Sequence, residues 1–327
     1  MKITLTTFNC ENLFNRYAFL DQTWDKKNYD KFIMASTVAS VANRQGELVT
    51  YTTTQTQRAN TAAAILEVKP DILIVNEIEN LYTLRNFNAE FLKNYFDRML
   101  AIDGNDPRGI DVGILIRKGC TAQVTAVRTH VDDRADSSKP VTRRSVANFG
   151  YQVSNAIFSR DCLEVDVRAG GQTLTLMANH LKAQDSKPAV SRVRRQKQAE
   201  RVADLVTAAV TAGRKPIVLG DLNTDPVKSP DDKSLASLIK HAELQDPFAG
   251  ATKDERWTHF YDSGSGSVSR LDYILPHKSL TVTGRSVMRK GLSKKAERFH
   301  TETPFPTIEG DHTEASDQCT VSVVLDV

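Results

Sequence analysis

Polar side chains follow apolar stretches at five points of this 327-residue chain. The five segments are Phe8-Asn9-Cys10-Glu11, Asn76-Glu77, Asn179-His180, Gly220-Asp221-Leu222-Asn223 and Ser316-Asp317. Carboxylate and carboxamide oxygens suit a hard divalent cation, while amide and imidazole groups can hold phosphoryl oxygens. If the fold gathers these residues at one place, they predict a site for the hydrolysis of a phosphate ester.

The spacing within the segments supports a shared site. Asn9 and Glu11 lie two positions apart, and so do Asp221 and Asn223, so on a strand each pair points to one face. Glu77 follows the run Asp71-Ile72-Leu73-Ile74-Val75, which predicts a buried strand. A carboxylate at that point is costly unless a cation or hydrogen-bond donors satisfy it, so Glu77 is the strongest candidate metal ligand.

The composition indicates a globular chain with a large core, because 40% of its residues are hydrophobic. The net charge of +3 is compatible with a polyanionic partner without demonstrating one. No apolar run reaches the roughly 18 residues of a membrane span, and the N-terminus enters a strand pattern directly. We therefore expect no membrane span, no signal peptide and a cytoplasmic location, or a secreted protein if a leader has been removed. The four cysteines lack metal-site spacing and are predicted to be free thiols.

The predicted elements are strands with helices between some of them. Apolar, β-branched stretches predict strands at Lys2 to Asn9, Asp71 to Asn76, Asp111 to Arg117, Ala156 to Val167, Gln172 to Asn179, Pro216 to Asp221, Arg270 to Pro276 and Thr320 to Val327. Helical spacing of apolar residues occurs at 59–66, 202–209 and 235–239. Helices that lead into buried strands indicate αβ units, while the alternation in 172–179 is typical of a half-solvated or sandwich strand. These patterns predict an α/β fold with two sheets.

Three polar, weakly patterned segments predict long loops, at Asn15 to Gln57, Arg128 to Arg144 and Phe260 to Arg270. None resembles a linker between domains, and no segment repeats with a period of about 20 to 50 residues. We therefore expect residues 1–327 to form a single domain.

Seven motifs are spread over the chain. They are Thr7-Phe8-Asn9-Cys10-Glu11-Asn12-Leu13-Phe14, Asn76-Glu77-Ile78-Glu79-Asn80, Arg108-Gly109-Ile110-Asp111-Val112, Asn179-His180-Leu181-Lys182, Gly220-Asp221-Leu222-Asn223, Arg270-Leu271-Asp272-Tyr273 and Ser316-Asp317. In this order they resemble the motifs of the endonuclease/exonuclease/phosphatase superfamily, the DNase I-like proteins. The chain resembles the bacterial branch of this superfamily over nearly its whole length. The resemblance implies a four-layer α/β/β/α sandwich of two mainly antiparallel sheets with outer helices, and a phosphoesterase site that uses Mg²⁺ or Mn²⁺.

The resemblance also implies a role for each site residue. The metal ligands would be Glu77, Glu11, Asn9 and Asp317. The catalytic residues would be Asp221, which orients water, Asn223 and His180, which contact phosphoryl oxygens, and Asp272, which orients the residue at position 318. Asp317 and Gln318 itself complete the catalytic set. Asn9 would also contact the phosphate.

Arg108 and Arg144 are further phosphate-binding candidates, because they fall in segments that resemble the family's cleft. For other residues the sequence leaves ordinary structural roles open. Glu77 can be an exposed strand-end residue, Asp221 and Asn223 can form an Asx turn, and His180 can be structural. The basic run from Arg192 to Lys197 is typical of the solvated face of a helix.

Position 318 departs from the family. The usual ending is Ser-Asp-His, whereas this chain has Ser316-Asp317-Gln318. An amide donates a hydrogen bond but does not titrate, so Gln318 cannot shuttle a proton. Three explanations remain open: His312 or His180 compensates, the protein is catalytically silent, or the substitution was introduced to inactivate it.

The resulting hypothesis is a metal-dependent phosphodiesterase that hydrolyses nucleic acid by water attack on phosphorus, with activity weakened at position 318. One alternative is a phosphomonoesterase or a phospholipid-type diesterase acting on another phosphate ester. A second alternative, from a different class, is a catalytically silent protein that binds phosphate or nucleic acid.

Overall fold

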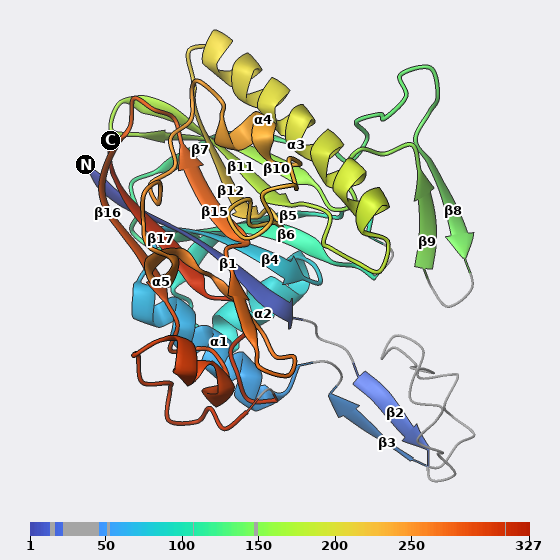
Figure 1. Ribbon diagram of the computed structural model, residues 1–327, viewed down its shortest axis with the longest axis vertical. Coiled ribbons are helices and arrows are strands. Elements are labelled where there is room, and N and C mark those ends of the chain that lie inside the picture. The colour runs from blue at the N-terminus through green and yellow to red at the C-terminus, as the bar shows by residue number, and fades with distance from the viewer. Residues whose placement is uncertain (14–16, 22–45, 51–52, 107, 147–149, 311) are drawn as a thin grey trace.

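Two β-sheets packed face to face form the centre of the protein, as the computed structural model shows (Figure 1). The structure describes residues 1–13, 17–21, 46–50, 53–106, 108–146, 150–310 and 312–327. In spatial order, the strands of the larger sheet are β16 (Thr281–Met288), β17 (Thr320–Asp326), β1 (Lys2–Leu13), β4 (Ile72–Ile78), β6 (Asp111–Arg117) and β5 (Phe96–Ile102). Those of the smaller sheet are β15 (Asp272–Pro276), β12 (Lys215–Asp221), β11 (Gln172–His180), β10 (Cys162–Ala169) and β7 (Gln123–Arg128).

Most neighbouring strands in both sheets are antiparallel. The exceptions among the described strands are β1 with β4 and β11 with β12, which run parallel. Three two-stranded hairpins add to the sandwich: β2 (Tyr17–Asp21) with β3 (Gly46–Thr50), β8 (Thr142–Val146) with β9 (Gly150–Ser154), and β13 (His259–Tyr261) with β14 (Ser267–Ser269).

Helices cover the outer faces of both sheets (Figure 1). They are α1 (Gln55–Val68), α2 (Leu81–Glu90), α3 (Pro188–Thr211), the short α4 (Ala236–Ile239) and α5 (Lys253–Arg256), and the 3₁₀ helix η3 (Lys294–Phe299). Side chains of α1 and α2 pack on the larger sheet, and those of α3 and α4 pack on the smaller one. The two remaining sheet faces meet in a core in which residues such as Leu5, Ile74, Leu176 and Ile217 are fully buried. The predicted four-layer sandwich is therefore confirmed.

Helix α1 also anchors the segment that carries the last predicted motif. The Thr61 hydroxyl donates a 2.7 Å hydrogen bond to the carbonyl of Ala315, and the Asn60 amide donates one of 2.6 Å to the carbonyl of Thr313. The helix begins at Thr54, whose hydroxyl accepts from the backbone N–H of Gln57 in a capping box. The chain before Ser316 is therefore fixed against a well-capped helix.

The structure differs from the sequence prediction where elements are short or exposed. The hairpin β13–β14 occupies most of the segment from Phe260 to Arg270, where the sequence predicted a loop. Its three-residue strands bury only Phe260 and Val268, so they show no periodicity from which they could be predicted. Strand β8 begins inside the predicted loop from Arg128 to Arg144, and the strand predicted from Ala156 begins only at Cys162. The segment predicted as a loop from Asn15 to Gln57 contains β2, β3 and the start of α1, while residues 15–16, 22–45 and 51–52 lie outside the described residues.

The prediction of a solvated face for Arg192 to Lys197 is wrong for one member. Arg195 is buried, donates to the carbonyl of Lys182 at 2.8 Å, and pairs with Asp232 at 2.6 Å. The cysteines are free thiols, as predicted. None of the helices in the described part of the chain combines the length and the apolar character that crossing a bilayer requires.

Candidate active site

Strand register explains why motifs that lie far apart in the sequence meet at one edge of the sandwich. In the smaller sheet, His180 on β11 is opposite Asp221 on β12, and Asp221 is opposite Asp272 on β15. In the larger sheet, Asn9 on β1 is opposite Asn76 on β4. Hydrogen bonds between the backbones of neighbouring strands thus place these polar residues next to one another.

Hydrogen bonds from Asn76 join the two sheets at this edge. Its side-chain amide donates to the carbonyl of Asn179 at 3.0 Å, and its side-chain oxygen accepts from the backbone N–H of Asp221 at 3.2 Å. Asn76 is fully buried, so both bonds form away from water. The separation between the two halves of the site is therefore fixed.

Three candidate residues have left-handed backbone conformations, which redirect their side chains. Glu11, Glu77 and Asn223 have φ angles of 46°, 61° and 59°. The pairing registers of β1 and β4 shift at Glu11 and Glu77, respectively, as in a β-bulge. Such conformations are unfavourable for residues with a Cβ atom and cluster where function requires them.

Gly220 is required by the close approach of β11 and β12. Its φ is 126°, and a Cβ atom at this position would lie 1.9 Å from the carbonyl oxygen of Asn179. No other residue type fits without moving one strand. The glycine of Gly220-Asp221-Leu222-Asn223 thus brings Asp221 up against β11.

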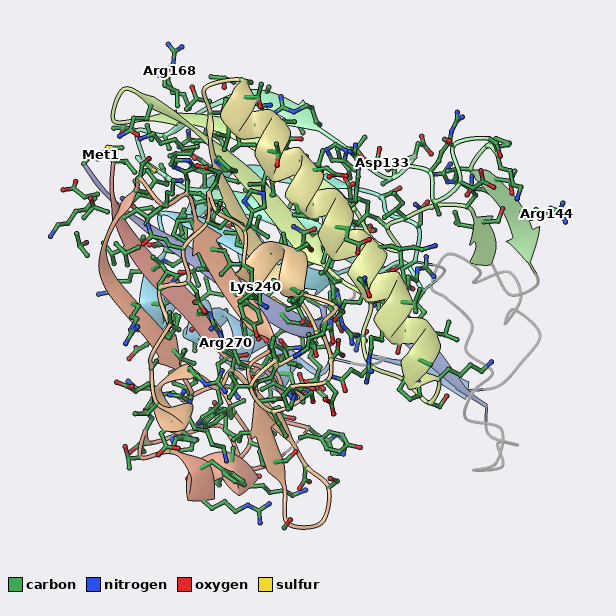
Figure 2. All side chains as sticks on the ribbon, turned by 45° about the horizontal axis from the view of Figure 1, so that its top comes forward. Met1, Asp133, Arg144, Arg168, Lys240 and Arg270 are labelled. Carbon is green, nitrogen blue, oxygen red and sulfur yellow. The ribbon has the colours of Figure 1, made fainter. Side chains whose placement is uncertain are left out.

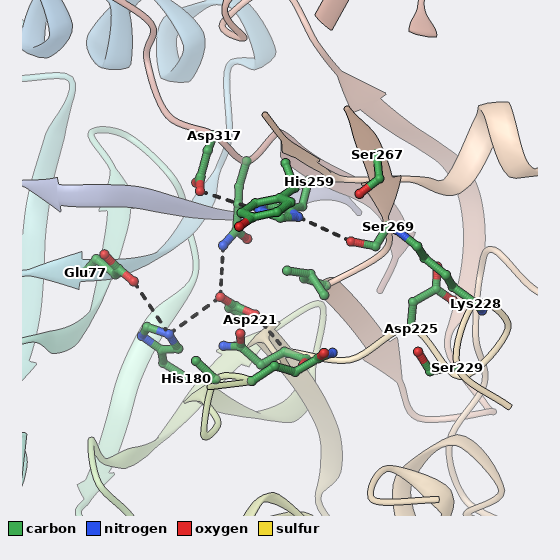
Figure 3. A pocket seen from close by; sticks show the side chains of 16 residues that line it. Glu77, His180, Asp221, Asp225, Lys228, Ser229, His259, Ser267, Ser269 and Asp317 are labelled. Atoms are coloured by element: carbon green, nitrogen blue, oxygen red, sulfur yellow. Dashed lines mark hydrogen bonds and ion pairs between the residues drawn. The ribbon is translucent and has the colours of Figure 1, made fainter. Parts of the chain in front are cut away.

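A buried network of amides and carboxylates forms the floor of the site (Figure 3). The amide of Asn9 donates to Asp221 Oδ2 at 3.0 Å and to Glu77 Oε1 at 3.4 Å. His180 Nε2 lies 3.5 Å from Asp221 Oδ2 and 3.8 Å from Glu77 Oε1. The structure therefore brings together the predicted residues Asn9, Glu77, His180 and Asp221.

The residues after Asp221 and at the end of the chain complete the network. Asp221 Oδ1 accepts from the backbone N–H of Asn223 at 2.9 Å, and Asp221 Oδ2 accepts from Gln318 Nε2 at 3.0 Å. The Asn223 side-chain amide donates to the carbonyl of Leu181 at 3.2 Å. Glu11 Oε2 accepts from the backbone N–H of Asp317 at 3.1 Å. Asn223, Glu11, Asp317 and Gln318 thus belong to the same cluster.

Asp272 was predicted to orient residue 318, but the two side chains have other partners. Asp272 Oδ2 accepts from the Thr258 hydroxyl at 2.7 Å, while Asp272 Oδ1 and Gln318 Oε1 have no hydrogen-bond partner among the described residues. The amide nitrogen of Gln318 is instead bound to Asp221. Asp272 is fully buried, so an unpartnered oxygen there is costly.

Crowding and burial oppose ionisation of the carboxylates. Burial and the nearby charge of Asp317 raise the pKa of Glu77 to about 7, although the positive charge of Arg160 acts to lower it. Burial and the charge of Asp317 also raise the pKa of Glu11 to about 9. Burial also raises the pKa of Asp221. The pKa of His180 falls well below its usual range because of burial and the charge of Arg160. Ionising all of these carboxylates together would thus place more negative charge in the cluster than its protein donors neutralise.

The donor chemistry of this cluster fits a hard divalent cation. Glu11, Glu77 and Asp317 offer carboxylate oxygens, and Asn9 offers a carboxamide, which are the ligand types of Mg²⁺ and Mn²⁺. Among the described residues no group of three or more His, Cys, Asp and Glu side chains already has the closeness of a formed metal site. A cation would relieve the repulsion that raises the pKa values of Glu11 and Glu77.

A cavity of about 510 Å³ opens above the network. Glu77, His180, Asp221 and Gln318 line its floor. The opposite wall carries side chains with hydroxyl or amine groups, namely Lys228, Ser229, Tyr261, Ser267 and Ser269. Such a cavity can hold a phosphoryl group on the floor and a polar leaving group against the wall.

Besides the hydroxyl and amine side chains of the cavity wall, the sequence analysis missed His259 and Arg160. His259, on β13, lines the cavity, and its Nε2 lies 3.5 Å from Asp317 Oδ2. Arg160 is buried beneath the network, pairs with Asp106 at 3.1 Å, and lowers the pKa of Glu77. His259 gave no signal because it falls outside every predicted strand and helix, one residue before the loop predicted from Phe260. Arg160 lies in a stretch that was predicted to be a strand, and no sequence pattern distinguishes it there from any other arginine.

The two arginine candidates lie in different surroundings. Arg108 pairs with Asp106 at 3.1 Å while 62% of its side chain remains exposed, and its charge contributes to the low pKa of His180. Arg144 is exposed on β8, in a hairpin that extends from the sandwich, and does not line the cavity (Figure 2). His312, considered above as a compensating group, is exposed and also does not line it. The structure therefore places Arg108, but not Arg144 or His312, near the network.

The fold is that of the DNase I-like class, and the family comparison supports a phosphoesterase. The chain belongs to the Endonuclease/Exonuclease/phosphatase family, whose model matches residues 7–317. A search of curated protein sequences found no match.

Several solved structures share the fold at low sequence identity. An endonuclease/exonuclease/phosphatase family protein from Bacteroides thetaiotaomicron is 15% identical, with a TM-score of 0.61, covering 99% of this chain and 95% of that one. A D. rerio TDP2 complexed with single strand DNA product is 14% identical, with a TM-score of 0.59 over 100% and 99%. A mannosyl-6-phosphatase from B. thetaiotaomicron is 16% identical, with a TM-score of 0.60 over 99% and 100%. At these identities the similarity establishes the fold.

Proposed function

We propose that the chain is a Mg²⁺- or Mn²⁺-dependent phosphodiesterase that hydrolyses nucleic acid. One observation carries the chemistry: the buried carboxylate of Asp221 lies on the floor of the cavity, where Asn9 and Gln318 each donate a 3.0 Å hydrogen bond to its Oδ2. Such a carboxylate is held in a fixed orientation and can align a water molecule for attack on phosphorus.

The other residues of the network have complementary tasks. Glu77, Glu11, Asn9 and Asp317 would hold the cation, which when bound neutralises phosphoryl charge as a Lewis acid. Asn223 and His180 would donate hydrogen bonds to phosphoryl oxygens. In the reaction the oxygen of water bonds to phosphorus, the ester P–O bond breaks, and the leaving oxygen takes up a proton.

Exposed positive charge near the network and along α3 supports nucleic acid as the substrate. Arg108 is largely exposed next to the network, and Arg192, Arg194 and Lys197 are exposed along α3. The similar TDP2 structure was solved with a single-stranded DNA product, which supports the same substrate class here. Phosphate contacts by such cations give affinity without sequence preference.

A phosphomonoesterase is the second candidate, and the wall of the cavity favours it. Ser229, Ser267, Ser269 and Lys228 offer hydrogen bonds suited to a small polar leaving group. The similar mannosyl-6-phosphatase points in the same direction. A phospholipid-type diesterase lacks comparable support, because these side chains are polar.

A metal-dependent activity panel tests the proposal. Purified protein is stripped of metal and assayed with Mg²⁺ or Mn²⁺ on plasmid DNA, single-stranded DNA, RNA and small phosphate esters. Glu77→Gln serves as the inactive variant and Glu90→Gln, an exposed glutamate at the end of α2, as its matched control. Cleavage of small esters alone would favour the second candidate, and no metal-dependent hydrolysis of any substrate would contradict both.

A further inference from the structure

An imidazole lies beside position 318 although position 318 itself carries an amide. His259 and Gln318 face each other in an isolated antiparallel bridge, which ties β13 to the segment after Asp317. The backbone N–H of Phe260 donates to the carbonyl of Asp317 at 3.0 Å, and that of Cys319 donates to the carbonyl of Thr258 at 2.7 Å. The backbone therefore sets His259 next to the residue whose family counterpart is a histidine.

The ring of His259 is held by neighbours on three sides. Its Nδ1 lies 3.3 Å from the hydroxyl of Ser269, its partner in the β13–β14 register, and its Nε2 lies 3.5 Å from Asp317 Oδ2. The ring stacks on Tyr261 with centroids 6.4 Å apart. Only 15% of the side chain is exposed, and the ring lines the cavity together with Asp221 and Gln318 (Figure 3). This is a positioned side chain and not a freely moving one.

Gln318 is already committed to another contact. One N–H of its Nε2 donates to Asp221 at 3.0 Å, and its Oε1 is an acceptor, so the amide can offer the cavity only its second N–H and supplies no imidazole. A phosphoryl group on the floor of the cavity would then receive at most one amide hydrogen bond from position 318. The nearest imidazole on that wall is that of His259.

We propose, on the basis of the phosphoesterase function above, that His259 donates the imidazole hydrogen bond to the scissile phosphoryl group in place of residue 318. Gln318 then orients Asp221 through its hydrogen bond, and His259 contacts the phosphoryl group. The contact is a hydrogen bond that grows stronger as negative charge develops on the phosphoryl oxygens.

Substitutions at positions 259 and 318 test this assignment together. His259→Ala should lower kcat by about 10²-fold, as expected for the loss of one donor to a transition-state oxygen, and should change KM much less. His259→Gln should retain more activity than His259→Ala, because its amide can still donate. His312→Ala, at an exposed histidine outside the cavity, should match the parent.

The double variant provides the sharper readout. Relative to its effect on the parent, Gln318→His should raise the activity of His259→Ala by about tenfold or more, since one imidazole can replace the other. Thermal unfolding of each variant verifies that the fold persists. If His259→Ala stays within about threefold of the parent, or if Gln318→His restores nothing, the assignment is wrong while the phosphoesterase function stands. An inert parent would overturn both.

Discussion

The side-chain amide of Gln318 donates a 3.0 Å hydrogen bond to Asp221, although 97 residues separate the two in the sequence. Asn9, near the N-terminus, donates to the same oxygen at the same distance. Burial raises the pKa of Asp221, and these hydrogen bonds work against that rise. A single carboxylate is thus oriented by amides from opposite ends of the chain. The site therefore requires motifs that are spread over the whole sequence.

Removing the carboxylate of Glu77 should separate metal binding from folding. We expect Glu77→Gln to weaken Mg²⁺ or Mn²⁺ binding at least about 10- to 100-fold and to abolish metal-dependent turnover while the fold persists. Calorimetric titration with the metal alone measures the affinity, and Glu90→Gln is the control. Unchanged affinity in Glu77→Gln would remove this residue from the metal site.

Asp221→Asn should reduce turnover without a matching loss of substrate binding. The amide keeps the size of the side chain and can still accept from Asn9 or Gln318, but it cannot accept a proton from water. We expect kcat to fall by about 10²- to 10⁴-fold. Steady-state kinetics decide the point, and a loss confined to KM would mean that Asp221 binds substrate only.

Gly220→Ala should disrupt the junction of β11 and β12. The added Cβ would lie 1.9 Å from the carbonyl oxygen of Asn179, so we expect a loss of more than about 2 kcal/mol in the free energy of unfolding. Gly119→Ala is a matched control, because its φ is also positive, at 78°, but no atom lies within 4 Å of the added Cβ. Its cost should be the backbone strain alone, about 1–2 kcal/mol. Equal losses in urea denaturation would show that the close approach has no energetic effect.

His130 should make stability depend on pH in the alkaline range. Burial lowers its pKa, but hydrogen bonds to Asp133 at 3.1 Å and Glu164 at 2.9 Å outweigh burial and raise the pKa to about 9. Because the folded pKa exceeds the unfolded value of about 6.5, the charged imidazole contributes its full stabilisation below that value and loses it as the pH rises through about 9.

We therefore expect His130→Gln to destabilise the protein more at pH 6 than at pH 10. Urea unfolding of parent and variant at both values gives the two differences in the free energy of unfolding. A difference that is the same at both pH values would show that the charge of His130 contributes nothing to stability.

Salt should distinguish the two substrate classes. If nucleic acid binds through the cations near the cavity and along α3, affinity should fall steeply between about 50 and 200 mM salt, because phosphate contacts release counterions. Fluorescence anisotropy with labelled single-stranded DNA and RNA measures the slope. Binding that does not change with salt, combined with hydrolysis of a small ester, would support the phosphomonoesterase candidate.

Sequence patterns predicted the parts of the site that local structure determines. Asp71 to Val75 is a buried run that ends in Asn76-Glu77, and Ile217 to Leu219 ends in Gly220-Asp221, so the ends of β4 and β12 were evident. The two-residue spacing predicted that Asp221 and Asn223 would share one face of a strand, but β12 ends at Asp221. Asn223 contacts Asp221 through its backbone N–H from a left-handed conformation with a φ of 59°.

Contacts set by long-range register could not be read in the same way. His259 reaches the cavity because a three-residue strand pairs with Ser267–Ser269 and bridges to Gln318, and none of these pairings has a local pattern. The bulges at Glu11 and Glu77 also depend on the neighbouring strands and not on residue type. Position 318 was recognised as unusual, but the bond from Gln318 to Asp221 required the packing of both sheets.

Hydrolysis in ¹⁸O-labelled water tests the central claim most directly. The metal-loaded protein is incubated with the best substrate of the activity panel, and the products are analysed by mass spectrometry. Water attack on phosphorus predicts one ¹⁸O atom in the product that carries the phosphate, none in the released alcohol, and no labelled product with Glu77→Gln. Label in the alcohol, or label incorporated equally by Glu77→Gln, would contradict the proposed chemistry.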